Sequence, residues 1–243
     1  MADLHLMALA ADPALIPGVY NACDQWCDYC PLTARCLAFR CWPRPDARGG
    51  VYHGVPAAMQ ASMSYLKDCL EAEGLAPPED LIRLLEDPSE EHLGAASHGD
   101  QLERLAEQYA ILATAFLESC EDVPEDLPRR PDGPQPFDIF FWYHGLIVTK
   151  IARAIMSAGE ASRTGGSAAR WDADVSARVA WIAIDRSDQA LKVMALDDVD
   201  SRIEHMRGHL TLLRRELEAR FPTAATLVRP GFDDGSGVAG RGR

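Results

Sequence analysis

The sequence predicts an all-α fold in which a body resembling a four-helix bundle follows an N-terminal cysteine-rich module. Three observations support this prediction. Four long segments repeat their apolar side chains at the three- and four-residue spacing of an amphipathic helix. No segment shows the sustained alternation of apolar and polar residues that is typical of a strand. Five of the seven cysteines fall between positions 23 and 41, before the four long helical segments.

The four long helices have recognisable ends. Asp100 can cap the first helix, because its carboxylate can accept hydrogen bonds from free backbone N–H groups. Gly165 and Gly166 belong to the connection before the third helix, and Pro222 stops the fourth. The third helix is apolar nearly all round between 179 and 184, so we expect it to run through the centre of the bundle. The expected long helices are 100–120, 137–156, 171–194 and 200–221, and two further helices are expected at 56–74 and from 77 to 85.

Composition divides the chain into three parts. Residues 1–50 form the cysteine-rich metal or iron–sulfur module, which ends in a linker rich in proline and glycine. Residues 51–222 form the helical bundle. Residues 223–243 are expected to be a flexible tail, because the stretch GFDDGSGVAGRGR is too glycine-rich and polar to pack.

Charge and composition restrict the class of partner. The chain is 47% hydrophobic and 25% charged, as in ordinary globular proteins. Its net charge of −13 argues against nucleic acid and anionic membrane, which bind mainly through lysine and arginine. The N-terminus lacks the pattern of a signal peptide, and no apolar run approaches the length of a membrane span. We therefore expect a cytoplasmic protein; its partner is unknown, and a redox partner or a small molecule is compatible with the charge.

The cysteine cluster reads CDQWCDYCPLTARCLAFRC, with gaps of three, two, five and four residues. In a reducing cytoplasm this crowding favours thiolate ligands over disulfides. Pro31 suits the first turn of a helix that runs to about Arg40, with Cys30 at its cap and the positive helix end facing an anionic centre. The candidate metal ligands are Cys23, Cys27, Cys30, Cys36 and Cys41.

Three interpretations of this cluster remain open. The first is a 4Fe-4S cluster on Cys23, Cys27, Cys30 and Cys36, with Cys41 as a spare or substitute fourth ligand. The second is structural zinc on four of the five cysteines. The third is an ordinary helix in which the first three cysteines form one apolar stripe. The two isolated cysteines, Cys69 and Cys120, are expected to be buried bystanders, each at the end of an amphipathic helix.

Parts of the cluster resemble known iron–sulfur sequences. The first three cysteines, with Tyr29, resemble the cluster loop of radical S-adenosylmethionine enzymes, but the chain lacks the strands and the glycine-rich motif of that family. The spacing from Cys27 to Cys41 resembles the auxiliary iron–sulfur (SPASM-like) modules attached to such enzymes, although its last gap is one residue longer. The stretches CDQWCDYCPLTARC, FWYHGLIVTKIARAI and VAWIAIDRS also resemble an uncharacterised family of bacterial helical proteins, which implies no catalytic role.

Polar residues within the apolar helices give a second candidate site. A charge inside a bundle must be paired or neutralised, so a salt bridge from Asp185 to Lys150 or Arg153 is the simpler expectation. The alternative is a polar pocket that binds a ligand or metal inside the bundle. The pocket candidates are Tyr109, Asp138, His144, Lys150, Arg153 and Asp185.

These observations leave three functional hypotheses. The main one is a helical metal-binding protein whose thiolate-ligated centre, a 4Fe-4S cluster, has a redox or structural role. The alternative is an enzyme with a polar active-site pocket in the bundle and a structural zinc module. The third is a non-catalytic interaction protein that contains zinc.

Overall fold

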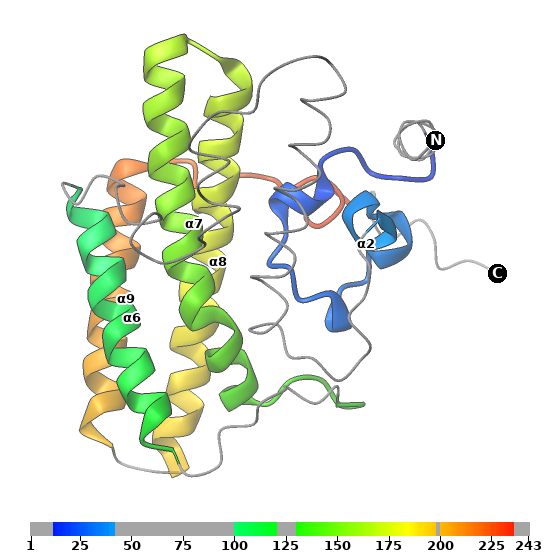
Figure 1. Cartoon of the computed structure of the whole chain (residues 1–243). Helices are drawn as coiled ribbons and strands as arrows, with labels where there is room; N and C mark the ends of the chain where they lie inside the picture. Colours follow the sequence, from blue (N-terminus) through cyan, green and yellow to red (C-terminus); the bar gives the residue numbers. More distant parts are fainter. Residues whose placement is uncertain (1–11, 42–99, 121–129, 198–199, 236–243) are drawn as a thin grey trace, which may run out of the picture. The chain divides into compact units, whose positions relative to one another are not determined.

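The computed structural model describes residues 12–41, 100–120, 130–197 and 200–235, which belong to one compact unit (Figure 1). This part of the chain contains helices and turns and no strand, so the all-α prediction is confirmed. The helices expected at 56–74 and 77–85, the proline- and glycine-rich linker and Cys69 lie outside the described residues.

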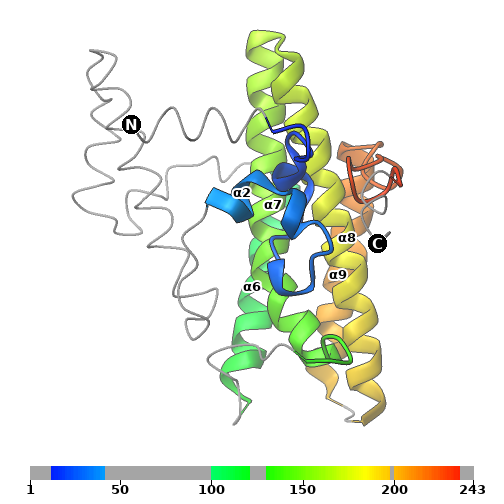
Figure 2. The same ribbon diagram turned by 90° about the vertical axis from the view of Figure 1, so that its right-hand side faces the viewer.

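Four long helices form the helical body. They are α6 (Gln101–Glu118), α7 (Pro136–Thr164), α8 (Ser167–Asp197) and α9 (Ser201–Arg220). Helices α7 and α8 are the longest and lie side by side over most of their length (Figures 1 and 2). Helix α6 packs against α7 and α9, and α8 packs against α7 and α9. Each helix of the body therefore has two helical neighbours.

The helix ends follow from local chemistry. Asp100 accepts a 2.9 Å hydrogen bond from the Leu102 N–H and caps α6, as predicted. Asp200 caps α9 in the same way. Helix α7 begins with a capping box between Gln135 and Asp138. It continues to Thr164, beyond the expected end at Met156, and ends at Gly165, whose φ of 70° is strained for other residues.

The core of the body is formed by large apolar side chains from all four helices. They include Tyr109, Phe140, Tyr143, Ile147, Ile184 and Leu213. In α8, Val179, Ala180, Ala183 and Ile184 are buried, whereas Trp181 and Ile182 are only half-buried. The apolar stretch of α8 therefore has one partly exposed side, so the expectation that it runs through the centre of the bundle is wrong for that side. By length and composition, with a mean hydropathy of 1.2, α7 could also cross a membrane, a criterion that core helices of soluble proteins also meet.

The cysteine module, here residues 12–41, packs against α7 and α8 as a chain of short turns (Figure 2). Its elements are η1 (Val19–Ala22), η2 (Cys27–Tyr29), η3 (Thr33–Arg35) and α2 (Leu37–Cys41). The predicted continuous helix from Pro31 to Arg40 is wrong. Cys36 has an extended backbone, with φ −106° and ψ 119°, and separates η3 from α2.

The C-terminal segment, residues 222–235, turns back onto the cysteine module. Ala224 and Gly231 are buried, and Phe232 packs against the apolar cluster of Ile16, Val19 and Leu32. The expectation of a tail that does not pack is therefore wrong for residues 223–235. Phe232 is apolar and Gly231 has no side chain, so both residues can pack against the module. The high glycine and polar content of the whole segment does not show this.

Candidate metal centre

The four cysteines at positions 23, 27, 30 and 36 stand where the backbone changes direction. Cys23 is extended after η1, and Cys30 and Cys36 are extended after η2 and η3. Between the first two cysteines, Gln25 has a φ of 60°, which is uncommon for a residue other than glycine. The interpretation of Cys23, Cys27 and Cys30 as one stripe of a regular helix is therefore wrong.

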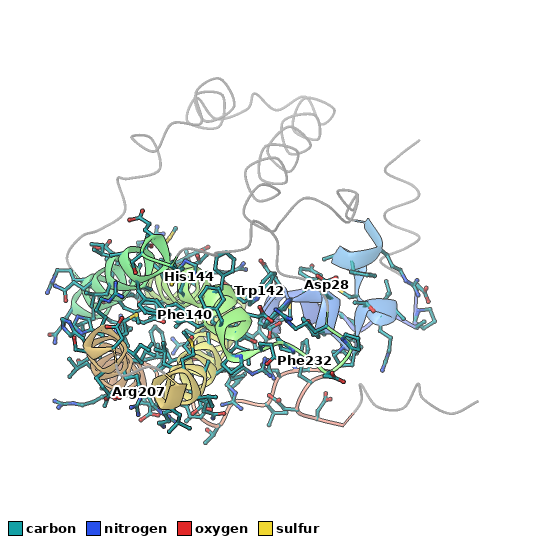
Figure 3. All side chains as sticks on the ribbon, turned by 90° about the horizontal axis from the view of Figure 1, so that it is seen from below. Asp28, Phe140, Trp142, His144, Arg207 and Phe232 are labelled. Atoms are coloured by element: carbon teal, nitrogen blue, oxygen red, sulfur yellow. The ribbon has the colours of Figure 1, made fainter. Side chains whose placement is uncertain are left out.

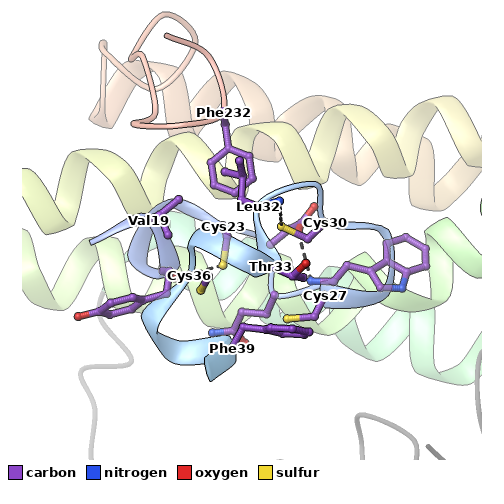
Figure 4. Close-up of a pocket in the computed structure, with 13 residues that line it drawn as sticks. Val19, Cys23, Cys27, Cys30, Leu32, Thr33, Cys36, Phe39 and Phe232 are labelled. Atoms are coloured by element: carbon purple, nitrogen blue, oxygen red, sulfur yellow. Dashed lines mark hydrogen bonds between the residues drawn. The ribbon is translucent and has the colours of Figure 1, made fainter. Parts of the chain in front are cut away.

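These four cysteines line a single pocket (Figure 4). The volume of this pocket that a water molecule can reach is about 20 Å³, and the pocket is partly open to solvent. Aromatic and aliphatic side chains complete its walls, chiefly Val19, Trp26, Leu32, Phe39 and Phe232. The result is a thiol-lined cavity with a largely apolar surround.

The backbone already contacts two of the thiols. The Cys23 thiol donates a 3.2 Å hydrogen bond to the Tyr20 carbonyl oxygen. The Leu32 N–H donates to the Cys30 sulfur over 3.4 Å. Such N–H donors stabilise negative charge on a ligand sulfur and tune the potential of an iron–sulfur centre. Cys30 therefore has a contact that suits a thiolate.

Three of the four thiols have raised pKa values, so they are protonated at neutral pH when no metal is bound. Desolvation raises the pKa of Cys23 to about 11. Desolvation, reinforced by the neighbouring thiols of Cys23 and Cys30, raises the pKa of Cys27 to about 12, and desolvation also raises the pKa of Cys30. Thiols of this kind are poor nucleophiles at neutral pH. A metal that binds them must displace their protons.

The candidate ligands are not arranged around a single point. Within the described ranges, no group of three or more histidine, cysteine or acidic side chains is arranged to hold one metal ion. Cys41 ends α2, and its side chain lies outside the description. Cys120 is half-buried and donates to the Phe116 carbonyl oxygen over 3.4 Å, so its expected full burial is wrong.

The helical body holds the cysteine loop through Asp24, a residue that sequence reasoning missed. The phenol of Tyr143 donates to the Asp24 carboxylate over 2.6 Å, and Arg186 donates to the same oxygen over 3.1 Å. The Trp142 indole N–H donates to the Asp24 carbonyl oxygen over 3.0 Å. The rings of Trp142 and Trp26 are stacked with centroids 4.9 Å apart. The only available signal was the aromatic content of the segments FFWYH and CDQWC.

Most candidates for a pocket inside the body make other contacts. Asp138 pairs with Arg130 over 2.9 Å at the start of α7, and a His144 ring nitrogen lies 2.6 Å from the Phe141 carbonyl oxygen. Tyr109 is fully buried, and its pKa is raised by that burial. None of these three residues lines the thiol pocket or the second pocket, which is formed around Tyr29 and Arg130.

The predicted partners of Asp185 are wrong. Asp185 pairs with Arg214 of α9 over 3.1 Å, because it lies on the side of α8 that meets α9. Arg153 instead forms two hydrogen bonds with Asp172 of α8, of 2.9 and 2.7 Å. Lys150 is buried on α7.

No protein-family model, curated protein or solved structure matches this chain. The described residues themselves define a four-cysteine pocket held against a helical body.

Proposed function

We propose that Cys23, Cys27, Cys30 and Cys36 ligate a 4Fe-4S cluster with a redox or structural role. The observation that supports this proposal is that all four line one pocket although they are spread over three turns of backbone. Cysteine thiolates are the usual ligands of such clusters. The Leu32 N–H donor at the Cys30 sulfur adds a contact of the kind found around cluster ligands.

The arrangement of the cysteines favours a cluster over a single ion. In a structural zinc site all four sulfurs lie about 2.3 Å from the ion and therefore close around one point. Among the described residues, the four cysteines line one pocket, but no three ligands are arranged to hold one metal ion. A centre made of several atoms can bind sulfurs that do not meet at one point. Structural zinc is the competing outcome of the test below.

The proposed role follows from the number of cysteine ligands and from the apolar side chains that line the pocket. A cluster with a cysteine on each iron has no free position for a substrate, which favours electron transfer, redox sensing or structural stabilisation over catalysis. The walls are largely apolar but the pocket is partly open, and solvent exposure is one of the factors that set a cluster's potential. Reduced thiols and a cluster suit a reducing compartment, so we propose a cytoplasmic location and, for the redox role, a redox partner.

Anaerobic purification tests the proposal directly. We expect a coloured protein with broad absorption near roughly 400 nm and about four iron and four sulfide per chain. Serine at any one of the four cysteines should remove most of the iron. The matched control is Cys120→Ser, which should keep the iron, and Cys41→Ser shows whether Cys41 substitutes for a ligand. A colourless chain with stoichiometric zinc, or with no metal, would contradict the proposal.

A further inference from the structure

Phe232 is a wall of the thiol pocket that comes from outside the cysteine module. Every other described residue that lines the pocket belongs to positions 19–39. Figure 4 shows the Phe232 ring reaching from the C-terminal segment toward Leu32, and Figure 3 shows Phe232 beside the cysteine module. Phe232, Cys30 and Cys36 all pack against the apolar cluster of the module. The C-terminal segment therefore covers a side of the pocket next to two of the candidate ligands.

The pocket is too small to receive a cluster unless a wall moves. The volume that a water molecule can reach is about 20 Å³, which is enough for about one water molecule. Four irons and four sulfides need several times that space. Cys27 is exposed, whereas Cys23, Cys30 and Cys36 are half-buried. A centre or a reagent that is to reach these three thiols must therefore displace part of the wall.

The cysteine loop and the C-terminal segment are held in different ways. Hydrogen bonds from α7 and α8 fix the loop to the helical body at Asp24. The C-terminal segment meets the loop through the apolar packing of Gly231 and Phe232. It also donates a long hydrogen bond, of 3.5 Å, from Arg229 to the Ala22 carbonyl oxygen. Apolar packing around Phe232 is therefore the main contact to be broken if this wall moves.

An ion pair within the segment holds Phe232 in place. Two Arg229 nitrogens, Nε and Nη2, each donate a 3.0 Å hydrogen bond to the Asp233 carboxylate and so close the turn that carries Phe232. The Arg229 guanidinium lies over the Phe232 ring, 4.7 Å from its centroid. Arg178 of α8 lies 3.9 Å from the same carboxylate and donates to the Ala225 carbonyl oxygen over 2.6 Å. The turn is thus anchored on the helical body and closes over the pocket from there.

We infer that residues 229–233 form a gate over the thiol pocket, in which Phe232 is the closing side chain and the ion pair just described is the latch. In the closed state the ring covers the side of the pocket beside Cys30 and Cys36. Opening the gate exposes these two thiols and widens the pocket. Cys27 is exposed already, so the gate does not control it. The gate's control of metal entry and release rests on the proposed metal centre, whereas its control of thiol access does not.

Alkylation of the reduced, metal-free chain by N-ethylmaleimide, followed at each cysteine by mass spectrometry, measures the gate. Phe232→Ala should raise the rates at Cys30 and Cys36 about tenfold relative to Cys27 of the same chain, because the packing that closes the pocket is lost. Asp233→Asn keeps the size of the side chain and removes the charge of the latch. It should raise the same two rates about threefold, since the latch is partly exposed.

Two further variants serve as controls. Val228→Ala truncates an apolar side chain of the same segment that is 60% exposed and lines neither pocket, so it should leave the rates unchanged. Phe232→Leu keeps an apolar wall and should react more slowly than Phe232→Ala. Wild-type rates at Cys30 and Cys36 in Phe232→Ala would overturn the gate, and so would equal rates in the leucine and alanine variants. If Phe232→Ala fails to fold, wild-type rates in Asp233→Asn would overturn it.

Release of iron to a chelator separates failure of the gate from failure of the proposed centre. In the metal-loaded protein, Phe232→Ala should speed release about tenfold and Val228→Ala should not change it. Wild-type release from Phe232→Ala would overturn the gate and leave the metal centre intact. A wild-type chain that binds no iron would overturn the proposed function instead, and the alkylation rates would still decide whether residues 229–233 control access to the thiols.

Discussion

The phenol of Tyr143 donates a 2.6 Å hydrogen bond to the carboxylate of Asp24, the residue next to Cys23. Arg186 of α8 bonds both to this carboxylate and to the phenol oxygen. Desolvation raises the pKa of Tyr143, so the phenol remains a proton donor throughout the neutral range. The centre of the helical body thereby fixes one end of the cysteine loop through a partly buried polar contact.

Removing this phenol oxygen should loosen the loop. We expect Tyr143→Phe to lower the free energy of unfolding by about 1.5–3 kcal/mol, the range for a hydrogen bond to a charged group. Metal affinity should fall as well, because Asp24 helps to hold its neighbour Cys23 in place. Urea unfolding and chelator competition measure the two effects. Tyr20→Phe is the control, since Tyr20 is 37% exposed. Equal midpoints for the two variants would show that the contact with Asp24 contributes nothing.

Gly231, in the C-terminal segment, packs tightly against the cysteine module. Its φ is 79°, and a Cβ there would lie 2.8 Å from Ile16 Cδ1 and 3.1 Å from Leu32 Cδ1. We expect Gly231→Ala to destabilise the protein by about 1–3 kcal/mol through overpacking, in addition to backbone strain. Because Phe232 lines the thiol pocket, the variant should also release its metal to a chelator faster.

Gly235→Ala is the matched control for this substitution. Gly235 has a similar φ of 74°, but a Cβ there would meet no atom of the described residues within 4 Å. The control therefore carries the backbone strain without the contact. If the two alanine variants have the same stability and the same rate of metal release, the close packing of Gly231 has no energetic role.

The helices were predictable because their signals are local. The spacing of apolar residues and the caps at Asp100 and Asp200 lie within a few positions of the helix ends that they define. The end of α7 was missed by eight positions. The residues between Met156 and Gly165 are compatible with a helix but carry no apolar stripe strong enough to show that it continues.

Contacts between distant segments were not predictable in the same way. Periodicity shows which face of a helix is buried, but it does not show which neighbour covers that face. The cation that pairs with Asp185 is therefore predicted on α7, whereas the structure shows that it is Arg214 of α9. The sequence places four cysteines close together along the chain, but for the anchoring role of Asp24 it offers only the aromatic content of FFWYH and CDQWC, and it carries no signal that Phe232 lines the pocket.

The carboxylate of Asp172 joins α8 to α7, and its contribution to stability should depend on pH. Burial opposes ionisation of its carboxyl group, but hydrogen bonds from Arg153 and Ser157 outweigh that effect and lower its pKa below the usual value. A carboxylate with a lowered pKa stabilises the folded state fully above the unfolded-state pKa of about 3.9. That stabilisation is lost as the pH falls through the lower pKa of the folded state.

We therefore expect Asp172→Asn to cost about 1–2 kcal/mol at pH 7, a value reduced from the buried range because Arg153 is partly exposed. The difference from wild type should shrink below about pH 4, because a protonated aspartate, like asparagine, is uncharged. Urea unfolding from pH 7 down to the lowest pH at which the protein stays folded measures it. Asp132→Asn, at an exposed position, should show no such dependence. A difference between Asp172→Asn and wild type that stays constant across this range would mean that the Asp172 charge does not stabilise the contact between α7 and α8.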